Sequence, residues 1–267
     1  MNNKYRKYRL VAEEPEGQGL HRNQGLYRIY ALRDIPKWDV KTGDRGGLIE
    51  KPTNLAQSGE AWVSGNAWVF GDAQVSGDAH VSGDAQVSGN AWVSGDAQVF
   101  GDARVSGNAR VFGDAQVFGN AWVSGNAQVF GEAWVSGNAW VFGDAQVSGN
   151  ARVSGNARVF GDARVSGNAR VSGDAQVFGN ARVFGDAWVS RNAWVMASRS
   201  DGYIFMLCQQ RKRGTPAVII AGCRYFTMAE ARKHWAKTRG GTKLGDETMA
   251  ILDYFEVRAK IEGWKLS

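Results

Sequence analysis

A valine recurs at every sixth position from Val63 to Val195, in a unit that in most copies reads Ala-x-Val-(Ser/Phe)-Gly-(Asp/Asn). Ala and Val lie two residues apart, so in an extended chain both side chains point to one face and the residues flanking Val point to the other. Gly followed by Asp or Asn provides a bend, because Gly tolerates positive φ. Such short strands can pair only with the turns of chain above and below them, which predicts a parallel β-helix.

The unit resembles the hexapeptide repeat of left-handed β-helix proteins, in which an aliphatic residue is followed four positions later by a small one. Val105 with Ala109, and Val153 with Ala157, follow this rule. The resemblance implies a triangular prism with three hexapeptides in each coil, so the 23 valine units would make between seven and eight coils. The residue after Val departs from the family pattern, because it is Ser 13 times and Phe nine times.

The segment before the repeat, residues 1–58, predicts a cap. Residues 25–32 have the pattern of a short strand, and residues 54–57 read as a degraded first coil with Leu55 in the Ala register and Gln57 where Val belongs. This leader, joined to residues 59–63, resembles the start of a group of hexapeptide-repeat proteins from phages, prophages and enterobacterial genomes. Members of that group are commonly described as transferases or polymer-forming proteins, and some have been proposed to counter host defence.

The period ends after the repeat region, residues 59–198, and residues 199–267 predict a small basic α+β domain. Two strands are expected, over 203–209 and 217–223. Thr227 and Glu230 form the pattern of a capping box that begins a helix to about Lys237, and a second helix is expected over 246–262. The fold class is therefore mainly β, a parallel β-helix with an N-terminal cap and a C-terminal α+β domain.

Charge is unevenly distributed along the chain. The net charge of +6 divides into +4 for residues 1–58, −4 for 59–198 and +6 for 199–267, so an anionic partner is expected to meet the ends. Only two cysteines are present, which is typical of a reducing compartment. The sequence contains no apolar run long enough to span a membrane and no signal-peptide pattern after Met1, which predicts a soluble cytoplasmic protein of a bacterial host cell.

Residues capable of catalysis or metal binding are few. Hexapeptide acyltransferases use a His as general base beside a loop that interrupts the coil, whereas His80 lies in an uninterrupted unit at an outward position and is expected to be a solvated surface residue. Cys208, Cys223 and His234 lack the spacing of a zinc site. These patterns predict a protein that is not an enzyme, with no cofactor and no metal, and leave acyl transfer as an alternative.

The outward positions carry more information. The residue before Val is Trp eight times, Arg seven times, Gln seven times and His once, and side chains so different in shape cannot exchange within a packed core. Sorting by 18 residues gives three columns: Trp62, His80, Gln98, Gln116, Trp134, Arg152, Arg170 and Trp188; Trp68, Gln86, Arg104, Trp122, Trp140, Arg158, Gln176 and Trp194; and Gln74, Trp92, Arg110, Gln128, Gln146, Arg164 and Arg182. Phe142, Phe160 and Phe178 are predicted to stack beside the second column.

Two interpretations of these columns remain open. The side chains can stack for stability, aromatic on aromatic and on Arg, or the second face can bind a partner, since Trp and Arg are enriched at binding hot spots. The predicted binding residues are Trp68, Arg104, Trp122, Trp140, Phe142, Arg158, Phe160, Phe178 and Trp194, with Arg211, Lys212 and Arg213 in the C-terminal domain.

The sequence therefore favours a non-enzymatic binding or scaffold protein of phage or prophage origin. The resemblance makes a host protein the expected partner, with inhibition of host defence as the specific hypothesis. Single-stranded nucleic acid is the third alternative, and is less favoured because only seven repeat arginines face three ways. Self-association as a homo-oligomer is also expected, through the C-terminal domain or the aromatic second face.

Overall fold

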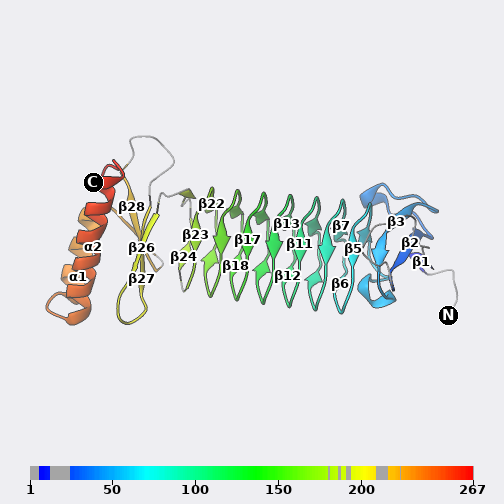
Figure 1. The fold of residues 1–267 in the computed structure, drawn as a ribbon, viewed down its shortest axis with the longest axis horizontal. Coiled ribbons are helices and arrows are strands. Elements are labelled where there is room, and N and C mark those ends of the chain that lie inside the picture. Colours follow the sequence, from blue (N-terminus) through cyan, green and yellow to red (C-terminus); the bar gives the residue numbers. More distant parts are fainter. Residues whose placement is uncertain are drawn as a thin grey trace, which may run out of the picture.

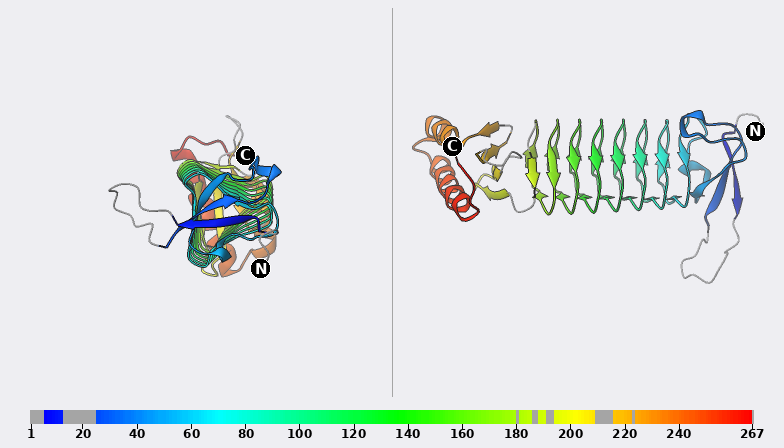
Figure 2. Two further views of the ribbon diagram at one scale, coloured as in Figure 1. Left: turned by 90° about the vertical axis from the view of Figure 1, so that its right-hand side faces the viewer. Right: turned by 90° about the horizontal axis from the view of Figure 1, so that it is seen from above.

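The computed structural model describes residues 6–12, 25–179, 181–185, 188–190, 194–208, 216–222 and 224–266. A straight β-solenoid forms the middle of the molecule, with a small antiparallel cap at its N-terminal end and a sheet carrying two helices at its C-terminal end (Figure 1). Viewed along the axis, the coils lie on top of one another (Figure 2, left). The predicted mainly β fold with a parallel solenoid is confirmed.

Three parallel sheets form the walls of the solenoid, and each coil contributes one short strand to each sheet. The first wall consists of β4 (Trp62–Val63), β7 (His80–Val81), β10 (Gln98–Val99), β13 (Gln116–Val117), β16 (Trp134–Val135), β19 (Arg152–Val153), β22 (Arg170–Ser172) and β25 (Trp188–Ser190). The second consists of β5 (Trp68–Val69), β8 (Gln86–Val87), β11 (Arg104–Val105), β14 (Trp122–Val123), β17 (Trp140–Val141), β20 (Arg158–Val159) and β23 (Gln176–Val177). The third consists of β6 (Gln74–Val75), β9 (Trp92–Val93), β12 (Arg110–Val111), β15 (Gln128–Val129), β18 (Gln146–Val147), β21 (Arg164–Val165) and β24 (Arg182–Val183).

The core of the solenoid is built from the Ala and Val of each unit. Val123 and Val141 pair across adjacent coils and both are 0% exposed. The backbone bonds run along the axis, as in the 2.9 Å bond that the Trp122 amide donates to the Ala139 carbonyl. Every coil therefore satisfies its strand amides and carbonyls on its neighbours, and the predicted assignment of inward and outward residues is confirmed.

The corners require glycine. Gly125 has φ of +70°, and a Cβ on it would lie 2.9 Å from the backbone nitrogen of Gly143 in the next coil. The Asn side chains after these glycines bond to one another along the corners, as in the 3.0 Å bond from Asn90 Nδ2 to Asn108 Oδ1. Small corner residues thus allow the coils to approach each other closely, and polar ladders hold the corners together.

The N-terminal cap is an antiparallel extension of the second wall. Strands β1 (Tyr8–Ala12), β2 (Tyr27–Ala31) and β3 (Arg45–Ile49) continue the sheet beyond β5. The 3₁₀ helix η2 (Pro36–Trp38) lies over the first wall, where Trp38 stacks on His80, and η3 (Pro52–Asn54) bonds to the following coil through Asn54 and the Ala73 carbonyl. Lys7 is fully buried and donates from Nζ to the Ala61 carbonyl at 2.7 Å. The predicted strand and capping role are confirmed.

One prediction for this cap is wrong. Leu55 pairs with Val75, so it takes the Val register rather than the Ala register. Gln57, expected at the Val position, instead accepts a hydrogen bond from the Lys7 amide at 2.8 Å. The same offset is present in β3, where Leu48 and Ile49 pair with Trp68 and Val69, so the first coil takes 20 residues rather than 18. It places the large side chain of Leu55 in the core in place of a polar one.

At the C-terminal end an antiparallel sheet closes the prism. Its strands are β26 (Trp194–Ser198), β27 (Ile204–Cys208), β28 (Val218–Ala221) and β29 (Arg224–Phe226), in that order. Met206, Cys208 and Ile220 pack against the core of the solenoid, whereas Phe205 and Ile219 pack against the helices. Only two strands were expected. The last hexapeptide supplies β26 and residues 224–226 supply β29, so Trp194 belongs to this sheet and not to the second column.

Two helices cover the outer face of this sheet (Figure 2, right). They are α1 (Met228–Arg239), which begins at the predicted Thr227–Glu230 capping box, and α2 (Lys243–Ile261), which begins three residues earlier than expected because Thr242 caps the Gly245 amide. Neither helix, nor any other in the described ranges, is long and apolar enough to span a bilayer.

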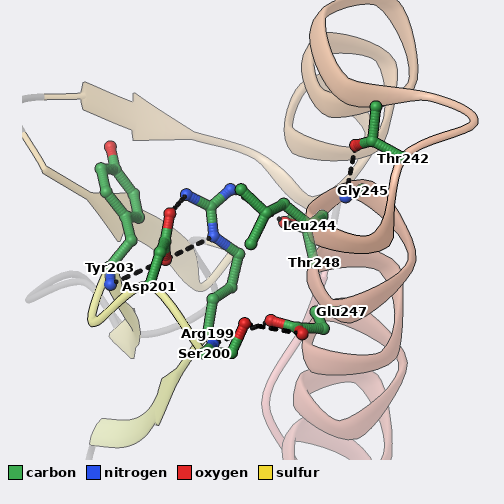
Figure 3. A network of polar contacts seen from close by, with 9 residues as sticks. All are labelled: Arg199, Ser200, Asp201, Tyr203, Thr242, Leu244, Gly245, Glu247 and Thr248. Carbon is green, nitrogen blue, oxygen red and sulfur yellow. Dashed lines mark hydrogen bonds and ion pairs between the residues drawn. The ribbon is translucent and has the colours of Figure 1, made fainter.

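A buried arginine fixes α2 to the sheet (Figure 3). Arg199 is 6% exposed, pairs with Asp201 at 2.6 Å and donates from Nη1 to Thr248 Oγ1 at 3.3 Å. The guanidinium also lies 4.8 Å from the centre of the Tyr203 ring. Beside it, the carboxylate of Glu247 accepts hydrogen bonds of 2.8 Å from the amide and the hydroxyl of Ser200. The helix is therefore held rigidly at its N-terminal half.

Candidate functional site

The second wall presents two parallel columns of outward side chains, one from the residue before Val and one from the residue after it. In the first column Trp68, Gln86, Arg104, Trp122, Trp140, Arg158 and Gln176 stand in register. The predicted second column is thus confirmed from Trp68 to Gln176. We refer to Trp122, Trp140, Arg158, Phe142, Phe160 and Phe178 as the aromatic face.

Two neighbouring tryptophans form the centre of the aromatic face. Trp122 and Trp140 are 37% and 39% exposed, and their rings meet edge to face with centroids 5.3 Å apart. Trp122 Nε1 donates to Ser106 Oγ at 3.1 Å, and the Arg158 guanidinium lies 5.0 Å from the centre of the Trp140 ring. These contacts fix the orientation of both rings while leaving more than a third of each exposed.

The phenylalanines of the aromatic face form the predicted ladder. The centroids of Phe142 and Phe160 are 4.9 Å apart, those of Phe160 and Phe178 are 5.2 Å apart, and the rings are nearly parallel. Each Phe is partly buried, since its neighbours in the column cover its ring faces. The ladder extends the apolar surface along the axis beside Trp140 and Arg158.

The other two walls carry smaller versions of the same arrangement. On the third wall Trp92 is 44% exposed, with the Arg110 guanidinium 6.0 Å from its ring centre, and Phe112 stacks on Phe130. On the first wall Arg152 lies 4.4 Å from the centre of the Trp134 ring. Stacking along columns is therefore a general feature of this solenoid. The aromatic face differs because it joins two exposed tryptophans in adjacent coils to a run of three phenylalanines.

The N-terminal cap changes the environment of two outward residues. Trp62 is 1% exposed, and His80 is partly buried because Trp38 stacks on its imidazole with centroids 4.6 Å apart. The Nε2 atom of His80 lies 2.8 Å from Ser64 Oγ, and burial lowers the pKa of the imidazole from 6.5 to about 4. The prediction of a solvated His80 is wrong, because residues 36–38 fold back over the first wall.

The remaining predicted binding residues are dispersed. Trp68 and Arg104 stand in the same column as Trp122, but Trp68 is partly buried. Trp194 leaves the column for β26, and Arg211, Lys212 and Arg213 lie outside the described residues. The structure thus brings six of the twelve together on the aromatic face and places Arg104 next to Trp122.

The thiol and imidazole groups of the C-terminal domain do not converge on a site. Cys208 is buried against the end of the solenoid, where burial raises the pKa of its thiol to about 12. His234 stacks on Phe226, and Cys223 falls outside the described residues. Within the described ranges no three His, Cys, Asp or Glu side chains are placed to hold a metal ion.

Comparison with protein families finds a match within the repeat. The YdcK beta-solenoid repeat model matches residues 73–89, 85–101, 97–113, 103–117, 115–131, 145–161, 151–165, 163–175 and 175–191. The matches lie within the solenoid, and together with the three parallel sheets they support a β-solenoid repeat protein. No curated protein matches the chain significantly.

Proposed function

We propose that this chain is a non-enzymatic binding protein and that the aromatic face is the surface on which a protein partner docks. The observation that carries the proposal is the exposed pair Trp122 and Trp140, fixed by Ser106 and Arg158 on a flat wall. Trp and Arg are the side chains most enriched at binding hot spots. Rings that are already ordered lose little entropy when a partner covers them, so the surface is preorganised.

The extent of the surface supports the same proposal. The Phe142–Phe160–Phe178 ladder continues the apolar strip for two further coils, and Asp144 and Asp162 follow the ladder at the neighbouring corner. An apolar centre bordered by polar groups is the usual composition of a protein interface. Stacking for stability alone would not require the tryptophans of adjacent coils to remain exposed.

The finer form of the proposal concerns the partner. The sequence resembles phage and prophage proteins of the hexapeptide-repeat group, so we propose a host protein, and specifically one that acts in host defence, as the partner. A binding protein that blocks such a target needs a large rigid surface rather than a catalytic centre, and the uninterrupted walls of the solenoid supply one.

Acyl transfer is the second candidate function. The described contacts of His80 are the Trp38 ring and the Ser64 hydroxyl, and the imidazole is partly buried beneath the cap. A general base must reach the proton that it removes, and neither of these contacts is the carboxylate that would orient such a base. Soaking crystals with acetyl-CoA tests this candidate, since an ordered ligand beside His80 would favour it over the binding proposal.

Nucleic acid is the third candidate, and its test is separate. Electrophoretic shifts with single-stranded DNA over a salt series should show no affinity that falls steeply as salt rises. The column that contains Trp122 and Trp140 has only two arginines, Arg104 and Arg158. Two positive charges are too few for a surface that follows a phosphate backbone.

The direct experiment replaces both tryptophans by glutamine. Gln86 and Gln176 already occupy this column, so the double change Trp122→Gln with Trp140→Gln should leave the fold intact. The matched control is Trp92→Gln on the third wall. Partners captured from host lysate by the wild-type chain are identified by mass spectrometry, and the purified partner is then titrated calorimetrically.

The double variant should bind that partner about 30-fold more weakly, equivalent to about 2 kcal/mol, while the control binds normally. Equal binding by the double variant and the wild-type chain would refute the proposed surface. A loss of binding only in Trp92→Gln would refute the aromatic face and indicate that the partner docks on the third wall.

A further inference from the structure

A second exposed apolar strip lies on α2, at the end of the molecule remote from the solenoid. Tyr254, Val257 and Ile261 are 46%, 54% and 66% exposed, and Ala250 is exposed one turn before them. Positions 250, 254, 257 and 261 recur with the spacing of one helical face, so their side chains form a continuous stripe. The opposite face of α2 carries Leu252 and Phe255 into the core of the C-terminal domain.

This stripe is presented by a rigid helix. Thr248 and Glu247 tie the N-terminal half of α2 to the turn between β26 and β27 through Arg199 and Ser200 (Figure 3). Arg232 of α1 bonds to Asp253 at 2.6 Å and to Glu256 at 2.9 Å. Because α2 is held both by the turn between β26 and β27 and by α1, it cannot rotate to bury its apolar stripe within the chain. Only another molecule can shield the stripe from water.

The charges beside the stripe indicate which molecule this is. Asp246 near the start of α2 and Lys260 near its end are both exposed, whereas Glu262 pairs with Arg258 of the same chain at 2.6 Å. A second α2 that runs antiparallel places Asp246 of one chain beside Lys260 of the other, and the two copies of this pair are centred on residue 253. A parallel pairing would instead place each charge next to its own copy.

We infer that the chain forms a two-fold symmetric dimer in which the α2 helices of two copies pack antiparallel through Tyr254, Val257 and Ile261. The axis passes near Asp253, whose charge is offset by Arg232 within the same chain. An isologous interface of this kind is the commonest arrangement of homo-oligomers. Because α2 lies across the end of the molecule (Figure 1), the two solenoids point away from each other.

The arrangement has a consequence for binding that is independent of the partner's identity. Each dimer carries two aromatic faces at a fixed separation, so a partner with two sites could be held by both with increased avidity. The dimer itself does not depend on the proposed function, since it rests on α2 alone.

Sedimentation equilibrium on the full chain at micromolar concentrations tests the inference. The wild-type chain should be a dimer, and the double variant Val257→Glu with Ile261→Glu should be a monomer with an unchanged circular dichroism spectrum. Both substituted side chains are more than half exposed, so folding should be unaffected. A wild-type monomer, or a dimer that survives the double change, would overturn the inference, the latter pointing to an interface elsewhere.

Charge reversal tests the antiparallel geometry. Asp246→Lys alone and Lys260→Glu alone each place like charges together twice in the dimer, which should weaken association about tenfold. Mixing the two variants in equal amounts restores both pairs, so a mixed dimer should form with near wild-type affinity. Lys237→Glu on α1 is the matched control and should have no effect. Failure of the mixture to associate more tightly than either variant alone would contradict antiparallel packing.

Discussion

Replacement of a corner glycine by alanine should cost most where coils are stacked. Gly167 and Gly185 occupy the same corner one coil apart, with φ of +69° and +64°. A Cβ on Gly167 would lie 2.9 Å from the backbone nitrogen of Gly185, whereas a Cβ on Gly185 would meet nothing closer than the Tyr225 ring at 3.9 Å. The two sites therefore share the backbone strain and differ in the contact with the next coil.

The magnitudes separate the two effects. Left-handed backbone costs an alanine about 1–2 kcal/mol, and the smaller entropy of the unfolded alanine chain offsets about 0.4–1 kcal/mol of this. Gly185→Ala should thus lower the free energy of unfolding by about 1 kcal/mol. Gly167→Ala must also push apart coils joined by bonds such as Ser166 N to the Val183 carbonyl at 2.8 Å, and overpacking of this kind adds about 1–3 kcal/mol.

Urea unfolding followed by circular dichroism measures both variants, and their m-values should match that of the wild-type chain. Both glycines lie in the last coils of the solenoid, so fraying of that end affects the two measurements alike. Equal losses of stability in Gly167→Ala and Gly185→Ala would refute the reasoning, because backbone strain alone would then explain the requirement for glycine.

Three further predictions follow from the buried groups and the stacking of coils. Val123 is 0% exposed, so Val123→Asp buries a carboxylate and should lower the melting temperature strongly and the free energy of unfolding by several kcal/mol. The outward Gln128→Arg should change the melting temperature little. Equal melting temperatures for the two variants would contradict the inward and outward assignment. Burial lowers the pKa of His80 from 6.5 to about 4, so between these pH values the unfolded chain binds a proton that the folded chain does not. The free energy of unfolding should therefore fall as pH decreases from 6.5 to 4, by at most about 3 kcal/mol. Urea midpoints for His80→Gln should fall less over this range, and an equal fall in the wild-type chain and the variant would count against the burial of His80. Amide hydrogen exchange should be slowest between about residues 80 and 180, since interior coils have two neighbours, and uniformly fast exchange there would be incompatible with a cooperative solenoid.

Much of the solenoid could be predicted from the sequence because its determinants are local. The spacing of Ala and Val decides which side chains point inward, and the 18-residue sorting places Trp122 beside Trp140 and Phe142 beside Phe160, as the structure confirms. The positive φ of Gly125 follows from the same pattern.

The ends could not be predicted in the same way, because their arrangement depends on contacts distant in sequence. His80 and Trp62 have the same local pattern as exposed outward residues, and only the cap buries them: Trp38 stacks on His80, and Gly46 of β3 lies against the Trp62 ring. Trp194 follows the repeat pattern, but an alternating strand pairs equally well in an antiparallel sheet, and β27 provides that partner. The Arg199–Thr248 bond joins residues 49 positions apart that share no motif.

The proposed binding surface can be tested most directly by hydroxyl-radical footprinting of tryptophan, mapped by mass spectrometry in the chain alone and in its complex with the captured partner. Trp92, Trp122 and Trp140 have similar exposures of 44%, 37% and 39%, so in the free chain they should be oxidised at comparable rates. In the complex Trp122 and Trp140 should be protected while Trp92 reacts as before. Unchanged oxidation of Trp122 and Trp140 in the complex would contradict the assignment of the aromatic face as the docking surface.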